Sequence, residues 1–201
     1  MWNTSHQLMG NLLPLIVVMP LLTWVAVDIV QRGVDSRTWL HLVIAVIGSW
    51  IALNFLALPG NQAMRKKLRL RLDAERPHDR RDRFFVGFAR PTFTSLLDPH
   101  EDVGYLILDK DSLEFIGESK HFLIKRTEVK EIRTRMNPHT LIGLGRWVSV
   151  EGVRSGHAIR MLVEPRDKWT LLGNLIASRS LLKTLRSWKS ERPQGESRGR
   201  L

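Results

Sequence analysis

Two long runs without a charged residue occupy the first third of the chain. Residues 8–27 and 38–58 contain no Asp, Glu, Lys or Arg, and a short polar stretch separates them. A helix rises about 1.5 Å per residue, so about 20 apolar residues cross a bilayer core of about 30 Å. The pattern therefore predicts a two-helix transmembrane hairpin in residues 1–62, with spans of about 8–30 and 37–58.

Two other interpretations of these runs fit less well. A cleaved signal peptide begins with positive charge, whereas no Lys or Arg precedes Arg32. A pair of buried core helices would need more covering chain than the remaining residues provide. Pro14 and Pro20 each remove a helical hydrogen bond and predict a kink in the first span. His41 and Asn54 are polar but uncharged, which makes a proton or transport pathway a poor interpretation.

The pattern changes to short strands from Phe84 onward. Runs such as VGYLILD and SLEFIGE are short and apolar, and turn-forming residues lie between them. About seven such runs predict an antiparallel sandwich or a partly open barrel. A helix is expected from about Pro165, with Trp169 in its core and an apolar face that includes Leu171, Leu175, Leu182 and Leu185. Residues 188–201 have no apolar period and are predicted to be disordered.

Charge divides the chain at the same place. The formal net charge is +11, and all of it lies in residues 63–201, because residues 1–62 are neutral overall. Residues 63–83 are predicted to be a basic juxtamembrane connector, which stays in the cytoplasm because Lys and Arg are retained on that side. With two spans, both termini and the soluble domain are then cytoplasmic, in a cell inner or plasma membrane.

Five side chains of this connector are predicted to contact the membrane surface. They are Arg65, Lys66, Lys67, Arg69 and Arg71. Each such charge contributes about 1 kcal/mol near anionic headgroups, without selecting one headgroup. The alternative is an ordinary basic flank that only fixes topology. Nucleic-acid binding is not expected, because no aromatic interleaving or groove-reading motif accompanies the basic run.

Few residues of the sequence point to a reaction. The absence of Cys excludes disulfides, Cys-ligated metals and thiol catalysis. One dense group of possible metal ligands consists of Asp98, His100, Glu101 and Asp102. Its spacing matches no EF-hand loop or HExxH helix, so an exposed acidic loop is the better interpretation. The sequence has no Gly-rich phosphate loop and no G-x-S-x-G elbow, and we predict no catalytic, metal or cofactor residues and no enzyme.

One segment resembles the opening of PH-like and GRAM-like domains: DVGYLILDKDSLEFIGESKHFLIKRTEVKEI. The matching positions are Gly104, Leu106, Leu108, Leu113, Phe115, Val129 and Ile132. The resemblance covers residues 84–187, about half of the chain. It implies an α+β, mainly β domain, an antiparallel barrel capped by a C-terminal helix, which acts as a binding or scaffold module. Lipid-binding members carry basic residues between the first two strands, whereas residues 91–103 are acidic here, so phosphoinositide binding is not expected.

The expected function is that of a membrane-anchored, cytoplasmic PH-like module that binds a protein or peptide partner. A groove between a sheet edge and the C-terminal helix could receive an extended strand of that partner. A second possibility, an accessory subunit of a membrane transporter or enzyme complex, would need a polar stripe along the hairpin. A third, an unrecognised enzyme, would need a deep pocket with converging ionisable groups.

Overall fold

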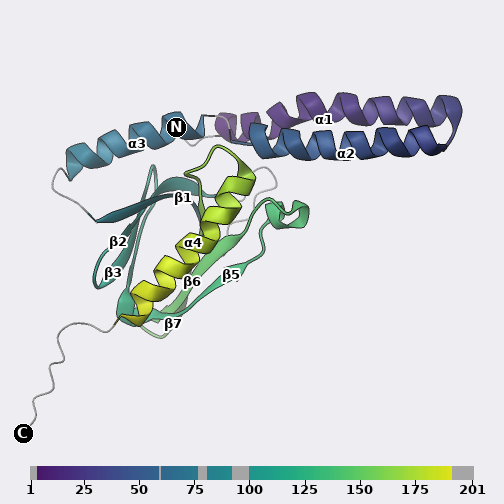
Figure 1. The fold of residues 1–201 in the computed structure, drawn as a ribbon. Helices are drawn as coiled ribbons and strands as arrows, with labels where there is room; N and C mark the ends of the chain where they lie inside the picture. The colour runs from purple at the N-terminus through teal and green to yellow at the C-terminus, as the bar shows by residue number, and fades with distance from the viewer. Residues whose placement is uncertain (1–3, 59, 77–80, 92–99, 192–201) are drawn as a thin grey trace, which may run out of the picture.

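The computed structural model joins a helical hairpin, a linking helix and a sheet domain (Figure 1). It describes four stretches of the 201-residue chain: residues 4–58, 60–76, 81–91 and 100–191. The hairpin and the linking helix are α1 (Thr4–Arg32), α2 (Ser36–Leu56) and α3 (Asn61–Glu75). In Figure 1, α3 continues roughly in the direction of α2, and the sheet domain lies to one side of both.

Small side chains let α1 and α2 pack closely. Ala45 and Ala52 of α2 are buried, and Gly48 lies between them. A Cβ at Gly48 would meet Cδ1 at the end of the Leu21 side chain at 2.9 Å, so α1 approaches α2 closely here. Only 17% and 18% of the residues in the most apolar stretches of the two helices are buried. By length and composition, both helices are apolar and long enough to cross a membrane.

The turn of the hairpin is shorter than the sequence predicted. α1 runs through both of its prolines to Arg32, two residues past the predicted span, and it includes Asp28. Nδ1 of His41 lies 2.8 Å from Oδ2 of Asp28 and thereby links the two helices. Asp35 caps α2 by accepting a hydrogen bond from the N–H of Thr38 at 2.8 Å. The polar residues at this end close the turn.

In the described residues, seven strands of one antiparallel sheet precede a C-terminal helix, which confirms the predicted order of elements. The strands are β1 (Asp82–Ala89), β2 (Asp102–Leu108), β3 (Ser112–Gly117), β4 (His121–Lys125), β5 (Val129–Arg135), β6 (Trp147–Arg154) and β7 (His157–Pro165). Two 3-10 turns and the final helix are η1 (Arg126–Glu128), η2 (Pro138–Ile142) and α4 (Leu171–Ser190). The spatial order is β4-β3-β2-β1-β7-β6-β5.

The predicted barrel is wrong, because the sheet is open. β4 and β5 are its two edges, and no ladder joins them within the described residues. α4 lies against β5: Nε of Arg186 donates to the carbonyl of Ile132 at 3.0 Å, and Nζ of Lys189 donates to the carbonyl of Lys130. Two backbone carbonyls of β5 therefore accept hydrogen bonds from side chains of α4. This edge of the sheet is covered by α4 instead of being paired with β4.

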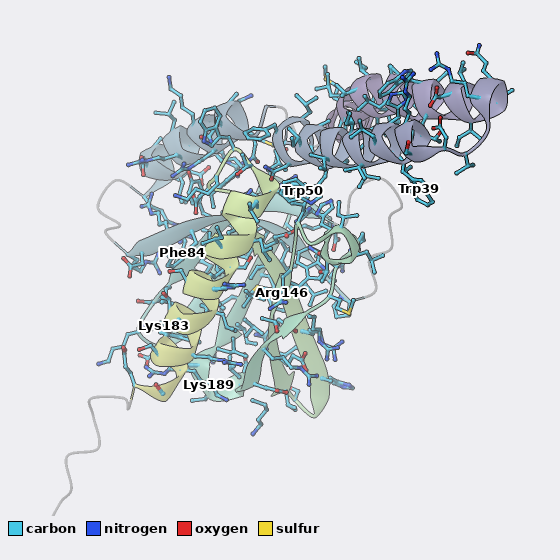
Figure 2. The ribbon with its side chains drawn as sticks, turned by 45° about the vertical axis from the view of Figure 1, so that its right-hand side comes forward. Trp39, Trp50, Phe84, Arg146, Lys183 and Lys189 are labelled. Carbon is cyan, nitrogen blue, oxygen red and sulfur yellow. The ribbon has the colours of Figure 1, made fainter. Side chains whose placement is uncertain are left out.

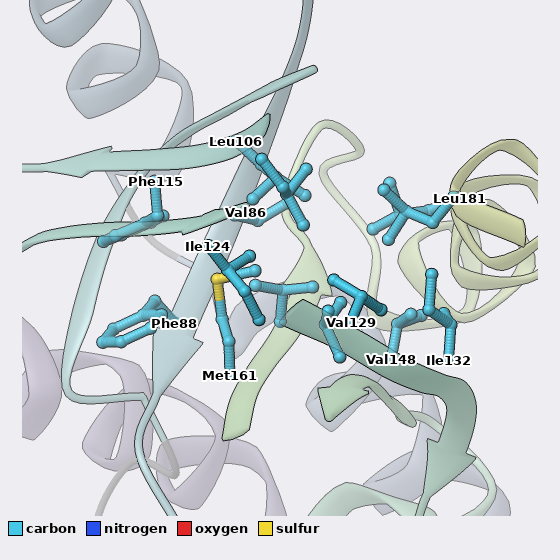
Figure 3. Close-up of a cluster of buried hydrophobic side chains, with 14 of the residues drawn as sticks. Val86, Phe88, Leu106, Phe115, Ile124, Val129, Ile132, Val148, Met161 and Leu181 are labelled. Atoms are coloured by element: carbon cyan, nitrogen blue, oxygen red, sulfur yellow. The ribbon is translucent and has the colours of Figure 1, made fainter. Parts of the chain in front are cut away.

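One hydrophobic core lies between the two halves of the sheet and α4 (Figure 3). The rings of Phe88 and Phe115 stack in it with their centroids 4.5 Å apart. α4 contributes Leu181, Leu185 and Trp188. The helix acts as the cover of this core, because the apolar faces of the open sheet would otherwise meet water.

α4 begins later than the sequence predicted, and its buried face matches the predicted one only in part, at Leu171 and Leu185. Pro165 ends β7, and Thr170 is the residue that caps α4. The buried face consists of Leu171, Asn174, Ser178, Leu181, Leu185 and Trp188. Leu175 and Leu182 are only partly buried, and Trp169 is exposed and does not join the core. The helix runs three residues past the predicted boundary at 187, and residues 192–201 lie outside the described residues.

The basic connector contains a helix that docks on the sheet. Met64, Leu68 and Leu72 recur every four residues on α3 and are buried in a second apolar cluster. Their partners on the sheet include Phe85 and Tyr105. The alternation of leucine and arginine in the sequence hides this row, because its first member is a methionine outside the alternating stretch. The connector is therefore packed on the sheet domain along much of its length.

Candidate binding groove

A groove of about 570 Å³ opens at the seam between β4 and the β5–β7 half of the sheet. Its floor is apolar and is made by Phe122, Val153, Ala158 and Ile159. Its charged residues are Arg90, Lys130, Glu131, Glu151 and Arg160. Phe122 and Ile159 also pack on the core, so the floor of the groove is continuous with it. The shape and lining suit a ligand with both apolar and charged groups.

Glu151 organises the charges of the groove. It accepts hydrogen bonds from Arg135 at 2.7 Å and from Arg133 at 2.9 and 3.1 Å, and Nε of Arg160 lies 3.3 Å from it. Burial opposes ionisation of Glu151, but the hydrogen bonds from Arg135 and Arg133 outweigh burial and lower its pKa to about 2. One carboxylate thus faces three guanidinium groups, and this side of the groove keeps an excess of positive charge.

The loop before β2 differs from the predicted exposed acidic loop. His100 and Asp102 are buried, and Glu101 pairs with Arg90 at 2.6 Å and with Lys120 at 3.4 Å. Oδ2 of Asp102 accepts hydrogen bonds from the backbone of the β3–β4 turn, including one from the N–H of Lys120 at 2.7 Å. Asp98 lies outside the described residues. The carboxylates of Glu101 and Asp102 therefore form ion pairs and hydrogen bonds within the chain.

A buried carboxylate, Glu164, holds η2 against the sheet. It accepts hydrogen bonds from Nδ2 of Asn137 and from the N–H of Arg146, each at 3.0 Å, and Nε2 of His100 lies 3.1 Å from it. Burial alone would raise the pKa of Glu164, but the imidazoles of His100 and His139 lower it far below its usual range. Among the described residues, no group of three or more His, Cys, Asp or Glu side chains is placed to hold a metal ion.

The sheet domain is bonded to the end of α2, where Figure 2 places Trp50. Nε1 of Trp50 donates to the carbonyl of Ile142 at 3.1 Å. Oδ1 of Asn54 accepts from the N–H of Leu172 at 2.8 Å. At the start of α3, Nδ2 of Asn61 donates to the carbonyl of Arg166 at 2.6 Å. These bonds fix the domain beside the hairpin.

The predicted membrane-contact residues all lie on α3, and the structure divides them into two groups. Three of the five form ion pairs within the chain: Arg65 with Asp167, Arg69 with Asp73 and Arg71 with Glu75. Lys66 and Lys67 are exposed and make no side-chain ion pair or hydrogen bond with the described residues. These two lysines are therefore the members most available to a membrane surface.

No family model matches this chain, and no curated protein matches it. Among solved structures, the C-terminal domain of an unknown protein from Leishmania infantum shows a limited likeness. It is 14% identical, with a TM-score of 0.38, over 63% of this chain and 98% of that one. A likeness of this size supports no statement about the function of this chain.

Proposed function

We propose that this protein is a membrane-anchored, cytoplasmic binding module of the PH-like class that holds an extended segment of a partner protein. Two apolar helices support the anchor. Seven antiparallel strands followed by a helix on one core support the class. The observation that carries the binding role is the groove beside β4, with its apolar floor and charged rim.

The seam beside β4 is a better place for the partner than the side of β5 next to α4. At β5, Arg186 and Lys189 already bond to backbone carbonyls, so an added strand would have to displace them. At β4, one carbonyl, that of Leu123, accepts a hydrogen bond from Arg154, and the neighbouring groove offers apolar floor residues for alternate side chains of an extended peptide. This moves the expected peptide site from the α4 side of the sheet to its open seam.

The chemistry of the groove favours a segment that combines apolar and acidic residues. Six cationic and three anionic side chains lie at or just behind its rim: Arg90, Lys120, Lys130, Arg133, Arg135 and Arg160 with Glu101, Glu131 and Glu151. Lys130 makes no side-chain ion pair with the described residues. Opposite charge on the partner would speed encounter and fix its register.

Two observations favour a peptide over a phosphoinositide. The guanidinium groups of Arg133 and Arg135 are already engaged by Glu151, which leaves fewer free donors for a phosphate. The apolar floor would gain nothing from an inositol headgroup. The accessory-subunit alternative needs a polar stripe on the hairpin, and two of the candidate residues for it, His41 and Asn54, are used in contacts within the chain.

The test is selection of peptides from a random library by the full chain in phosphatidylcholine nanodiscs. We expect acidic, apolar sequences, with affinity reduced at least about fivefold by Lys130→Glu, which corresponds to about 1 kcal/mol. Lys183→Glu is the matched control, because it makes the same charge change at an exposed lysine of α4. Equal losses in both variants, or saturable phosphoinositide binding in the groove, would refute the proposal.

A further inference from the structure

An exposed apolar patch lies on the sheet domain beside the end of α2. It consists of Met136, Leu141 and Ile142 around η2, and Trp169, Leu172 and Ile176 at the start of α4. Leu141 is 80% exposed and Trp169 is 76% exposed, although most other large apolar side chains of the domain are buried or partly buried. Several large apolar side chains exposed at one end of a domain mark a contact with a partner or a membrane.

The depth of the patch follows from its bonds to α2. Ile142 and Leu172 bond to Trp50 and Asn54, which precede the last residue of α2, Leu56, by six and two positions. At about 1.5 Å per residue, these positions lie about 9 and 3 Å inside the end of the helix. α2 has 21 residues and is about 32 Å long, which is close to the thickness of a bilayer core of about 30 Å. With α2 as the membrane span of the proposed function, the residues bonded to Trp50 and Asn54 lie at membrane depth.

The backbone of η2 suits this position. The N–H of Thr140 bonds to Asn137, the N–H of Gly143 to the carbonyl of Thr140, and the N–H of Leu144 to the carbonyl of His139. The hydroxyl of Thr140 donates to the carbonyl of Gly145 at 2.7 Å. Backbone groups that are satisfied within the turn lose little when water is replaced by lipid. η2 can therefore present its apolar side chains to lipid at low cost.

We propose that this patch inserts into the cytoplasmic leaflet next to α2, so that the sheet domain sits on the membrane at a fixed angle. The proposal rests on the membrane anchor of the proposed function and adds lipid as the occupant of the patch. Exposed tryptophan is typical of the headgroup boundary, and the free lysines Lys66 and Lys67 on α3 suit the anionic surface just beyond it.

This placement also determines which way the binding groove faces. η2 precedes β6 at Trp147, whereas the groove residues Gly152 and Val153 lie at the far end of that strand. At about 3.4 Å per residue, the groove is about 17 Å along β6 from the membrane-contacting end. The insertion therefore leaves the groove open to the cytoplasm.

The experiment uses the full chain, which has no cysteine of its own, in phosphatidylcholine–phosphatidylglycerol nanodiscs. An environment-sensitive fluorophore is attached through Leu141→Cys or, as the control, Lys183→Cys. Both side chains are exposed, so neither label disturbs the core. We expect iodide to quench the probe at 141 roughly tenfold less than the probe at 183, because lipid excludes ions, and doxyl-labelled lipid to quench only the probe at 141.

Each outcome decides the proposal. Equal iodide quenching at both positions, while alkaline carbonate leaves the protein in the membrane, would overturn the insertion and keep the anchor. Protection of position 141 from iodide without quenching by doxyl lipid would mean that protein, such as a second copy of the chain, covers the patch, and would also overturn it. Release of the chain by carbonate would overturn the anchor and the insertion together.

Discussion

The buried carboxylate of Glu164 gives the sharpest prediction about the fold. Glu164→Ala removes both oxygens that Asn137 and the N–H of Arg146 use, and it leaves His100 without its carboxylate neighbour. A buried donor without its acceptor costs about 1–3 kcal/mol, so the two donors together with the lost His100 contact cost about 3 kcal/mol even when water enters the space. Because these groups hold η2 to the sheet, the loss should be concentrated at η2 and at the start of β6.

The assay is hydrogen–deuterium exchange of the full chain in nanodiscs, followed in peptides that cover residues 137–147. A local loss of about 3 kcal/mol predicts exchange faster by roughly a hundredfold, since about 1.4 kcal/mol corresponds to a factor of ten. Glu131→Ala is the control, because Glu131 is an exposed carboxylate. If exchange in residues 137–147 changes no more in Glu164→Ala than in the control, Glu164 does not hold η2 as we argue.

Two further predictions concern the core and the pH dependence of stability. Leu185→Ala should lower the free energy of unfolding by about 2–5 kcal/mol, because Leu185 is completely buried. Leu70→Ala, at an exposed site of α3, should change it by less than about 0.5 kcal/mol. Similar denaturation curves of the two variants in detergent would contradict the packing of α4. The pKa of Glu164 is lowered in the folded state, so its contribution is present above the usual value of 4.5 and is lost as pH falls below it. Thermal unfolding between pH 3 and pH 7 should therefore vary less in Glu164→Gln than in the parent, and parallel profiles would contradict this.

The spacing of apolar residues along the chain predicted most helices and strands of this fold, because each type of element has a characteristic spacing. The leucines of the strand pair β2–β3 alternate, and the two apolar runs of the hairpin have the length of a span. The start of α4 was misplaced because Pro165 suits a helix start as well as a strand end. Its buried face was predicted only in part, because polar Asn174 faces the sheet while apolar Ile176 faces outward.

The groove and the Glu164 cluster could not be predicted, because both depend on strand register. Glu151 meets Arg160 as its direct partner on β7, and it meets Arg133 and Arg135 only through the pairing of β5 with β6. A register shift near the start of β5 sets that pairing, and no pattern of residues in the sequence predicts this shift. Long-range contacts of this kind appear only once the sheet is assembled.

The central claim is that a membrane hairpin holds the sheet domain in the cytoplasm. Two single-cysteine variants test it: Val34→Cys in the exposed turn of the hairpin and Lys183→Cys on the exposed side of α4. Both are expressed in bacterial spheroplasts and treated with a membrane-impermeant maleimide before and after permeabilisation. We predict that position 34 is labelled in intact spheroplasts and that position 183 is labelled only after permeabilisation. Labelling of position 183 in intact spheroplasts would contradict the account.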